Sequence, residues 1–174
     1  MAKKIIFIIN SVIFVALLMV SATNAEVLED EQNGYRIHYP FGWQVTRFPN
    51  SADLVKANIN RDSSTGLQVR IYPTNGRDFN SFVDWYVKDF MLQMKGGPRG
   101  NISLIDKNFT YIGVNEGCMI SFDSLKEDGS RWFMKEYLIP AGDKVYVLVS
   151  GTIFSSREQN EPLLDSIAQS LEFK

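Results

Sequence analysis

Residues 131–151, RWFMKEYLIPAGDKVYVLVSG, decide the fold that we expect for this chain. Side chains alternate in character along 131–139 and again along 145–150, so both segments predict β-strands. Residues 140–143 (PAGD) are turn formers and join the two strands in a predicted hairpin. Apolar residues occur on both faces of both strands, which is typical of strands that are covered on both sides. The pattern therefore predicts that this hairpin lies in the middle of a sheet, with helices packed on it.

The first 25 residues have the order of a secretory signal peptide. Lys3 and Lys4 form a short basic region, an apolar run follows at 5–20, and small residues lead to Ala25. We expect cleavage after Ala25, with cleavage after Ala22 as the alternative. A retained membrane helix is the competing interpretation, but an apolar run of 16 residues is short against the roughly 20 that a membrane span needs.

Removal of this segment from the 174 residues leaves 149, which is the length of one domain. We expect residues 26–33 to be a flexible lead-in and residues 34–174 to form a single domain. Loss of Lys3 and Lys4 lowers the basic residues from 18 to 16 against 20 acidic residues, so the net charge is near −4. A mildly acidic domain without a basic tract is not typical of nucleic-acid binding.

Several further segments have the alternating pattern of strands. They are residues 35–39, 44–48, 54–59, 67–72, 102–105, 109–112 and 118–122. In the first of them, Tyr35, Ile37 and Tyr39 share one face. Polar residues separate 102–105 from 109–112, so we expect two short strands there.

Two helices are expected. Apolar residues at spacings of three and four along 79–94 predict one amphipathic helix, and Asp78 is a suitable N-cap for it. A second apolar stripe predicts a C-terminal helix. Ser155 with Glu158, or Ser156 with Gln159, fits a capping box for an earlier start. We expect the main helix to start at Asn160 or Glu161, because Pro162 is tolerated best at a first helical position.

The order of these elements resembles the PsbP-like superfamily. The matching segments are 35–43 (YRIHYPFGW), similar to a family strand that ends in Pro-x-Gly-Trp, the aromatic helix at 78–95, and 164–173 (LDSIAQSLEF), where Leu171 replaces an aromatic residue of the family. The resemblance implies an α+β fold, an α/β/α sandwich around a twisted antiparallel sheet, within the secreted bacterial branch of the superfamily. Members of this superfamily bind or scaffold other proteins and are not, as a class, known as enzymes.

Residues that could carry catalysis are few. His38 is the only histidine, which excludes a histidine-based metal cluster. Cys118 is the only cysteine and lies in an apolar pattern, so we expect an inert, buried thiol. No Gly-x-Ser-x-Gly motif of a serine nucleophile occurs. We therefore expect no catalytic residue, no metal and no cofactor.

Four residues are candidates for ligand or partner binding. Trp85 lies beside the apolar stripe of the first helix, and tryptophan is enriched at binding hot spots. Arg36 and His38 share the polar face of the first strand, and Arg99 lies in the glycine-rich loop 96–100. The competing interpretation is structural for each of them: core packing for the tryptophan, an ordinary surface for the strand residues and a flexible connector for the loop.

These observations predict an exported, soluble, non-catalytic module that binds an unknown protein or small ligand in the cell envelope. We expect it to be periplasmic or secreted after cleavage, and to meet the membrane only through the signal segment before cleavage. Two alternatives stay open. One is an envelope hydrolase with a carboxylate-based site, and the other is a membrane-tethered subunit held by an uncleaved N-terminus.

Overall fold

The computed structural model describes residues 25–48, 54–94 and 101–174. The strands in chain order are β1 (Ala25–Asp30), β2 (Tyr35–Pro40), β3 (Gln44–Arg47), β4 (Val55–Asp62), β5 (Thr65–Pro73), β6 (Asn101–Ile112), β7 (Asn115–Leu125), β8 (Arg131–Ala141), β9 (Lys144–Ile153) and β10 (Glu172–Phe173). The helices are α2 (Phe79–Met94), the short 3₁₀ turn η1 (Phe154–Ser156) and α3 (Arg157–Gln169). Within the described ranges, no helix has the length and apolar character to cross a membrane. The segment predicted as a signal peptide lies outside these ranges, apart from Ala25.

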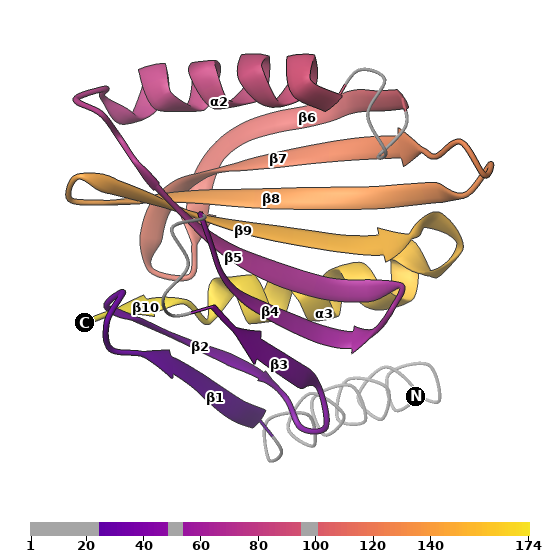
Figure 1. Cartoon of the computed structure of the whole chain (residues 1–174), viewed down its shortest axis with the longest axis horizontal. Coiled ribbons are helices and arrows are strands. Elements are labelled where there is room, and N and C mark those ends of the chain that lie inside the picture. The colour runs from indigo at the N-terminus through magenta and orange to yellow at the C-terminus, as the bar shows by residue number, and fades with distance from the viewer. Residues whose placement is uncertain (1–24, 49–53, 95–100) are drawn as a thin grey trace, which may run out of the picture.

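The strands form two antiparallel sheets (Figure 1). The larger sheet has seven strands in the order β3-β4-β5-β9-β8-β7-β6, and the smaller has three in the order β1-β2-β10. Strand β9 is the fourth of the seven, and it pairs with β5 along one edge and with β8 along the other. The prediction that the hairpin of residues 131–151 lies in the middle of a sheet is therefore confirmed.

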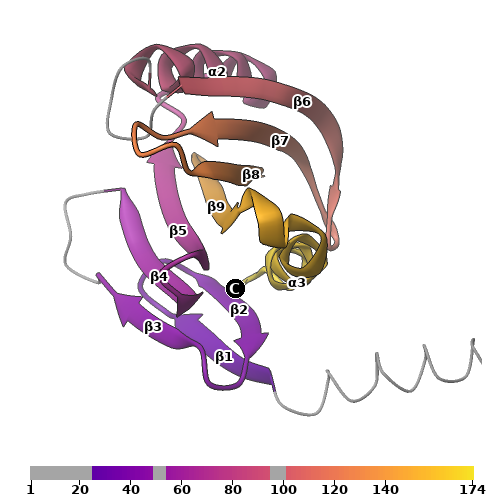
Figure 2. The ribbon, with the colours of Figure 1, turned by 90° about the vertical axis from the view of Figure 1, so that its right-hand side faces the viewer.

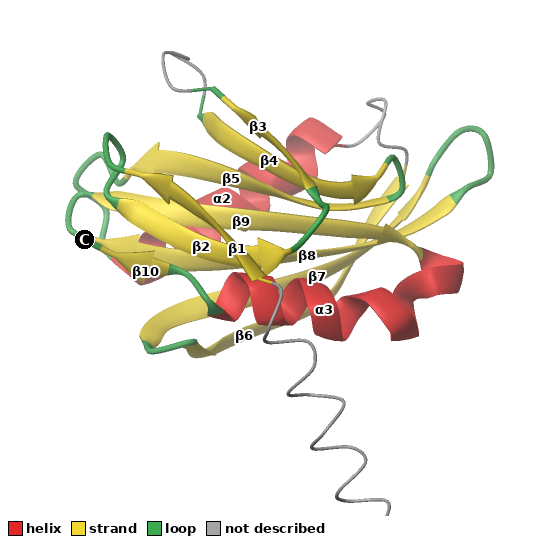
Figure 3. Cartoon of the chain, turned by 90° about the horizontal axis from the view of Figure 1, so that it is seen from below, coloured by secondary structure: helices red, strands yellow, loops and turns green. Residues whose placement is uncertain are grey.

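Different elements cover the two faces of the large sheet. Helix α2 lies on one face, and α3 with the three-stranded sheet lies on the other (Figures 2 and 3). On the first face, Phe82, Val83 and Tyr86 of α2 pack against buried residues of β7, β8 and β9. On the second face, Leu164 and Ile167 of α3 belong to a core that also includes residues of β1 and β2. The predicted α+β fold, an antiparallel sheet between helices, is confirmed.

Helix α2 begins as predicted. The carboxylate of Asp78 accepts hydrogen bonds from the backbone N–H of Ser81, at 2.9 Å, and from its hydroxyl, at 2.7 Å. These hydrogen bonds lower the pKa of the Asp78 carboxyl, because they favour its ionised form. Asp78 therefore caps the helix and satisfies one of the backbone donors that the first turn leaves free.

The flexible lead-in that we expected at 26–33 is not what the structure shows. Strand β1 pairs along its whole length with β2, from Ala25 opposite Pro40 to Asp30 opposite Tyr35. Leu28 is buried against this core, and the hydroxyl of Tyr39 donates a 2.7 Å hydrogen bond to Glu26. The acidic composition of the segment hid the strand, since only hairpin pairing with β2, across the turn at residues 31–34, makes it one.

Two further boundaries differ from prediction. Residues 101–112 form one strand, because a β-bulge between Leu104 and Asp106 lets pairing with β7 continue through the polar residues. Helix α3 starts at Arg157 rather than at Asn160 or Glu161, so Pro162 lies inside the helix. A proline there removes a helical hydrogen bond, so contacts with the sheet must stabilise this start.

The buried amide of Asn160 supplies such contacts. Its side-chain N–H group donates to the hydroxyls of Thr65, at 3.1 Å, and Thr152, at 2.9 Å. Its carbonyl oxygen accepts a 2.9 Å hydrogen bond from Arg61. Asn160 is fully buried, and so is Thr152. The first turn of α3 is therefore bonded to both β5 and β9, which outweighs the local preference for a later start.

Asn160→Ala tests this anchor. The substitution removes three hydrogen bonds and leaves a cavity at a fully buried site, so we expect the free energy of unfolding to fall by about 2–4 kcal/mol. Urea denaturation followed by circular dichroism measures the change. Asn80→Ala, on the exposed side of α2, is the matched control and should change stability by no more than about 0.5 kcal/mol. Equal stability of the two variants would contradict the role of Asn160.

A second polar contact holds the middle of α3. The ammonium group of Lys135, on β8, is nearly buried and lies 2.9 Å from a carboxylate oxygen of Glu161 and 2.9 Å from one of Asp165. Arg157 also donates to Glu161, at 2.8 Å, and the hydroxyl of Tyr137 donates to Asp165. Burial alone would raise the pKa of Glu161, but the hydrogen bonds from Arg157 and Lys135 outweigh it and lower that pKa. Folding therefore favours the ionised carboxylate.

Glu161→Gln tests this contact through pH. Because the pKa of Glu161 is lowered by folding, its contribution is complete above the ordinary value of 4.5 and is lost as pH falls through the lowered value. We expect the wild type to be about 1–2 kcal/mol more stable than the variant at pH 7, with the difference shrinking below pH 4.5. Urea denaturation at several pH values measures it. Glu158→Gln, exposed on the same helix, should show no such trend.

Candidate ligand-binding groove

The candidate residues of the first strand lie on the outer sheet. Arg36 is exposed and forms an ion pair with Glu172 of β10. His38 is partly buried on β2, and its backbone N–H donates a 2.9 Å hydrogen bond to the hydroxyl of Ser170. That hydroxyl also donates to the carbonyl of His38, at 3.1 Å. These contacts join β2 to the end of α3, and a binding role for Arg36 and His38 stays a prediction.

The other candidates lie elsewhere. Trp85 is partly buried on α2, with its ring 5.4 Å from that of Phe82 and the guanidinium of Arg77 4.8 Å from its centre. It belongs to the α2 face of the large sheet, whereas Arg36 and His38 lie on the side of the three-stranded sheet. Arg99 and the glycine-rich loop lie outside the described residues. The structure therefore does not bring the described candidates together in one site.

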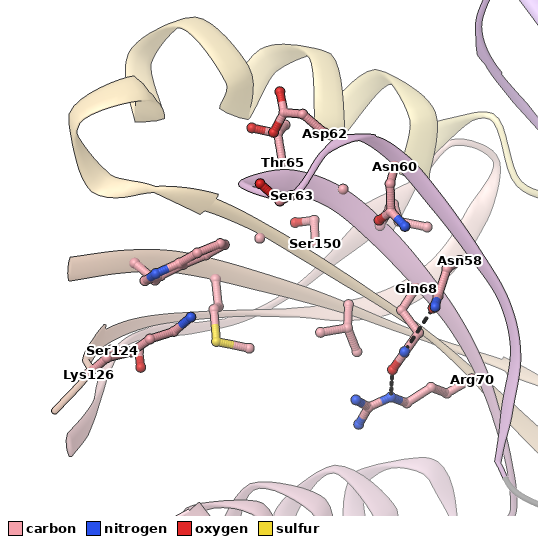
Figure 4. A pocket seen from close by; sticks show the side chains of 16 residues that line it. Asn58, Asn60, Asp62, Ser63, Thr65, Gln68, Arg70, Ser124, Lys126 and Ser150 are labelled. Atoms are coloured by element: carbon pink, nitrogen blue, oxygen red, sulfur yellow. Dashed lines mark hydrogen bonds between the residues drawn. The ribbon is translucent and has the colours of Figure 1, made fainter. Parts of the chain in front are cut away.

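A different site opens on the α2 face of the large sheet. It is a groove of about 310 Å³ over β4, β5, β9 and β8 (Figure 4). One bank carries Asn58, Gln68 and Arg70, and the opposite bank carries Ser124, Lys126 and Trp132. Met134, Val149 and Gly151 lie between them. No described residue of α2 lines the groove, so it occupies the part of the face beyond the helix.

On the bank formed by β4 and β5, the polar side chains are linked by hydrogen bonds. The side-chain N–H group of Gln68 donates to the carbonyl oxygen of Asn58, at 2.9 Å. The carbonyl oxygen of Gln68 accepts from Nε of Arg70 (Figure 4). Because both ends of the Gln68 amide are engaged, its orientation is fixed. The remaining side-chain N–H groups of Arg70 and of Asn58 have no bonding partner among the residues that the structure describes.

Gly66 leaves room for a neighbouring polar side chain on this bank. A Cβ atom at Gly66 would lie 2.1 Å from the side-chain oxygen of Asn60 and 3.0 Å from the carbonyl oxygen of Ile59. Any larger residue would therefore displace the Asn60 amide, which also lines the groove. Glycine at this position keeps a polar side chain close to the sheet.

The opposite bank is aromatic and basic. The ammonium of Lys126 lies 4.0 Å from the centre of the Trp132 ring, which is a cation–π distance. A Cβ atom at Gly151 would lie 4.0 Å from the same ring, so the indole lies close to the strand beneath it. The indole N–H is buried and has no hydrogen-bond partner among the described residues. This bank therefore offers an apolar surface beside a positive charge.

The charge balance of the groove is positive. Asp62 is the only carboxylate among the described residues that line it. Hydrogen bonds from Ser64, with the neighbouring Arg61 at 2.8 Å, lower the pKa of Asp62 to about 2. Its charge is thus already compensated, whereas neither Arg70 nor Lys126 forms an ion pair with any described residue. Two cations on opposite banks, neither in an ion pair with a described residue, favour an anionic ligand.

The described residues give little support for metal or thiol chemistry. The described residues contain no group of three His, Cys, Asp or Glu side chains that could hold a metal ion. Cys118 is buried on β7 within the core under α2. Burial raises the pKa of its thiol to about 11, which keeps it protonated at neutral pH. The expectation of an inert cysteine agrees with this environment.

Sequence reasoning missed the groove, although one signal for it existed. Gln68 and Arg70 form a polar face opposite the apolar face of their strand, and Trp132 shares a face with Met134 on β8. A polar face on a strand near the middle of a sheet indicates that no helix covers it there. The adjacency of β5 and β9, which brings the two faces together, was not available from local patterns.

Comparison with known proteins gives structural matches alone. No protein-family model and no curated protein sequence matches the chain. The solution structure of cyanobacterial PsbP (CyanoP) from Synechocystis sp. PCC 6803 matches with a TM-score of 0.68 and 15% identity, over 87% of this chain and 93% of that one. The Ran-binding protein Mog1p of Saccharomyces cerevisiae matches at 0.56 and 12%, over 86% and 95%.

A third match is LpqN of Mycobacterium tuberculosis, described as involved in cell envelope biogenesis. Its TM-score is 0.54 and its identity 14%, over 87% of this chain and 91% of that one. These matches confirm the resemblance drawn from the sequence: the chain has the PsbP-like fold. At such low identities they show the fold and leave the ligand to be argued from the groove.

Thiol labelling tests the environment of Cys118. Because its pKa is raised to about 11 by burial, we expect no measurable reaction with a disulfide reagent at pH 8 in the native protein and full reaction in urea. The variant Ser63→Cys places a second thiol at an exposed turn and should give one label per chain when native and two when unfolded. Native labelling of the wild type at the rate of the unfolded chain would contradict the buried placement.

Proposed function

We propose that the chain is an exported, non-catalytic binding module of the cell envelope, and that the groove is its binding site. The observation that carries the proposal is the pair of cations, Arg70 and Lys126, on opposite banks of one groove without an ion-pair partner among the described residues. A partly buried cation is stabilised by a nearby negative charge. A bound ligand would supply that charge.

The lining of the groove supports binding rather than hydrolysis. A carboxylate-based hydrolase needs two facing carboxyl groups, one of them able to hold a proton near neutral pH. Asp62 has a lowered pKa and is already paired. Glu136, two residues beyond Met134 on β8, is fully buried and is not part of the lining. The hydrolase alternative therefore finds no pair of acids in the groove.

Export is supported by the order of residues 1–25 and by the position of β1. Cleavage after Ala25 would leave a chain beginning at Glu26, whose carboxylate accepts the hydrogen bond from Tyr39. Processing at this bond would remove only the first residue of β1. The proposed mature chain therefore keeps the strand and its contacts. The fold shared with a protein involved in cell envelope biogenesis also agrees with this location.

Trp132→Ala tests the groove as the binding site. The chain with a C-terminal tag would be purified from the envelope of the cells that produce it, and native mass spectrometry would detect any retained molecule. We expect the wild type to retain a ligand or partner, and Trp132→Ala to retain at least about tenfold less, because the aromatic wall is lost. Trp85→Ala, the matched control on α2, should retain as much as the wild type.

The same mass spectra distinguish binding in the groove from binding elsewhere on the protein and from no binding. Equal retention by all three proteins would place binding outside the groove, and loss in Trp85→Ala alone would favour the helix surface instead. A wild type that retains nothing would count against a binding module. The intact mass also reports processing: a chain lacking residues 1–25 supports export, whereas a full-length mass would support the membrane-tethered alternative.

A further inference from the structure

The class of ligand can be narrowed from the chemistry of the two banks. This ligand class rests on the proposed function, in which the groove is the binding site. Arg70 uses its Nε–H on Gln68, which leaves the two terminal nitrogens of the guanidinium for another partner. Two parallel N–H groups of a guanidinium match the two oxygens of a carboxylate. Lys126 adds a second positive charge on the opposite bank.

The body of the ligand should carry hydroxyl groups. Among the described residues, the Asn58 side chain bonds through its carbonyl oxygen alone, by the 2.9 Å bond from Gln68, and Asn60 adds a second amide to the same bank. Amides both donate and accept hydrogen bonds, and so do hydroxyl groups. The wall and floor formed by Trp132, Met134 and Val149 are apolar and suit the C–H face of a ring. A sugar ring combines these two surfaces, with hydroxyls at its rim and C–H groups on its faces.

A peptide ligand fits less well. Peptides that bind sheets gain affinity from main-chain hydrogen bonds at a free strand edge. The groove lies over β5, β9 and β8, and β9 pairs on both sides. Backbone groups at the floor are therefore engaged in the sheet, so that recognition depends on side chains. The volume, about 310 Å³, is near the lower end of ligand pockets, on the order of 300–1,000 Å³, and suits one or two sugar rings.

We infer that the groove binds an acidic saccharide, with the carboxylate at Arg70, the hydroxyls at the Asn58 bank and a ring face against Trp132. Lys126 strengthens the attraction for the negative charge from the other bank. The preference for an acid over the matching neutral sugar is the property that distinguishes this ligand class.

Calorimetric titration of the processed chain with digalacturonate tests the inference. Its dimethyl ester is the matched neutral ligand, since it has the same rings and no charge. We expect the acid to bind at least about tenfold more tightly than the ester, because one charged contact of this kind contributes that much. Arg70→Gln should remove the preference, and Lys126→Gln, just after the end of β7, should reduce it. Lys144→Gln, at the opposite end of β9, should leave it unchanged.

Three outcomes would overturn the inference: no binding of digalacturonate, equal binding of acid and ester, or a preference that survives in both Arg70→Gln and Lys126→Gln. If one of these occurs while Trp132→Ala still abolishes retention of the native ligand, the groove remains a binding site and only the ligand class is wrong. If retention of the native ligand also fails to depend on Trp132, the proposed function fails as well. Binding of a simple acetate ion as tightly as digalacturonate would show an anion site without sugar recognition.

Discussion

The pairing of β9 along both of its edges is the constraint on which the rest of the structure depends. A strand paired with β5 on one side and β8 on the other can meet the surroundings only through its faces. Val147 on one face and Leu148 on the other are both fully buried, so each face needs a cover. The chain supplies α2 for one face, and α3 with the three-stranded sheet for the other. The paired edges also leave recognition to side chains, since the central backbone has no free groups.

Both covers pack through apolar side chains, but α3 has buried polar contacts with the sheet in addition. Helix α3 is anchored by polar contacts through Asn160 and Lys135, so its side of the sheet is closed by bonds between specific atoms. Helix α2 is held mainly by apolar contacts, among them the rings of Phe82 and Tyr86. Val149 lies both in the core beneath α2 and in the lining of the groove. The groove therefore begins where the apolar contacts of α2 end and the polar faces of β4 and β5 are exposed.

The sequence predicted the central hairpin, the faces of its strands and the first helix, because each rests on a local period of two or 3.6 residues. It did not predict β1, whose single buried residue, Leu28, gives no period, or the start of α3, which depends on contacts of Asn160 with β5 and β9. The groove was missed for the same reason. Arg70 and Trp132 are more than 60 residues apart, and only the long-range pairing of β5, β9 and β8 makes them opposite banks of one site.

The low sequence identity between this chain and the matched structures follows from the different requirements on core residues and groove residues. The core requires apolar residues in alternation, and many sequences meet that requirement, so identities of 12–15% are compatible with TM-scores of 0.54–0.68. Residues such as Asn58, Gln68 and Arg70 point to the face opposite the apolar residues of their own strands and belong to neither hydrophobic core. A Ran-binding protein of yeast and a protein involved in mycobacterial cell envelope biogenesis can thus share the fold with this chain. The fold positions the few side chains of the groove but leaves their chemistry free to vary, so what the groove can bind depends on those side chains and not on the fold.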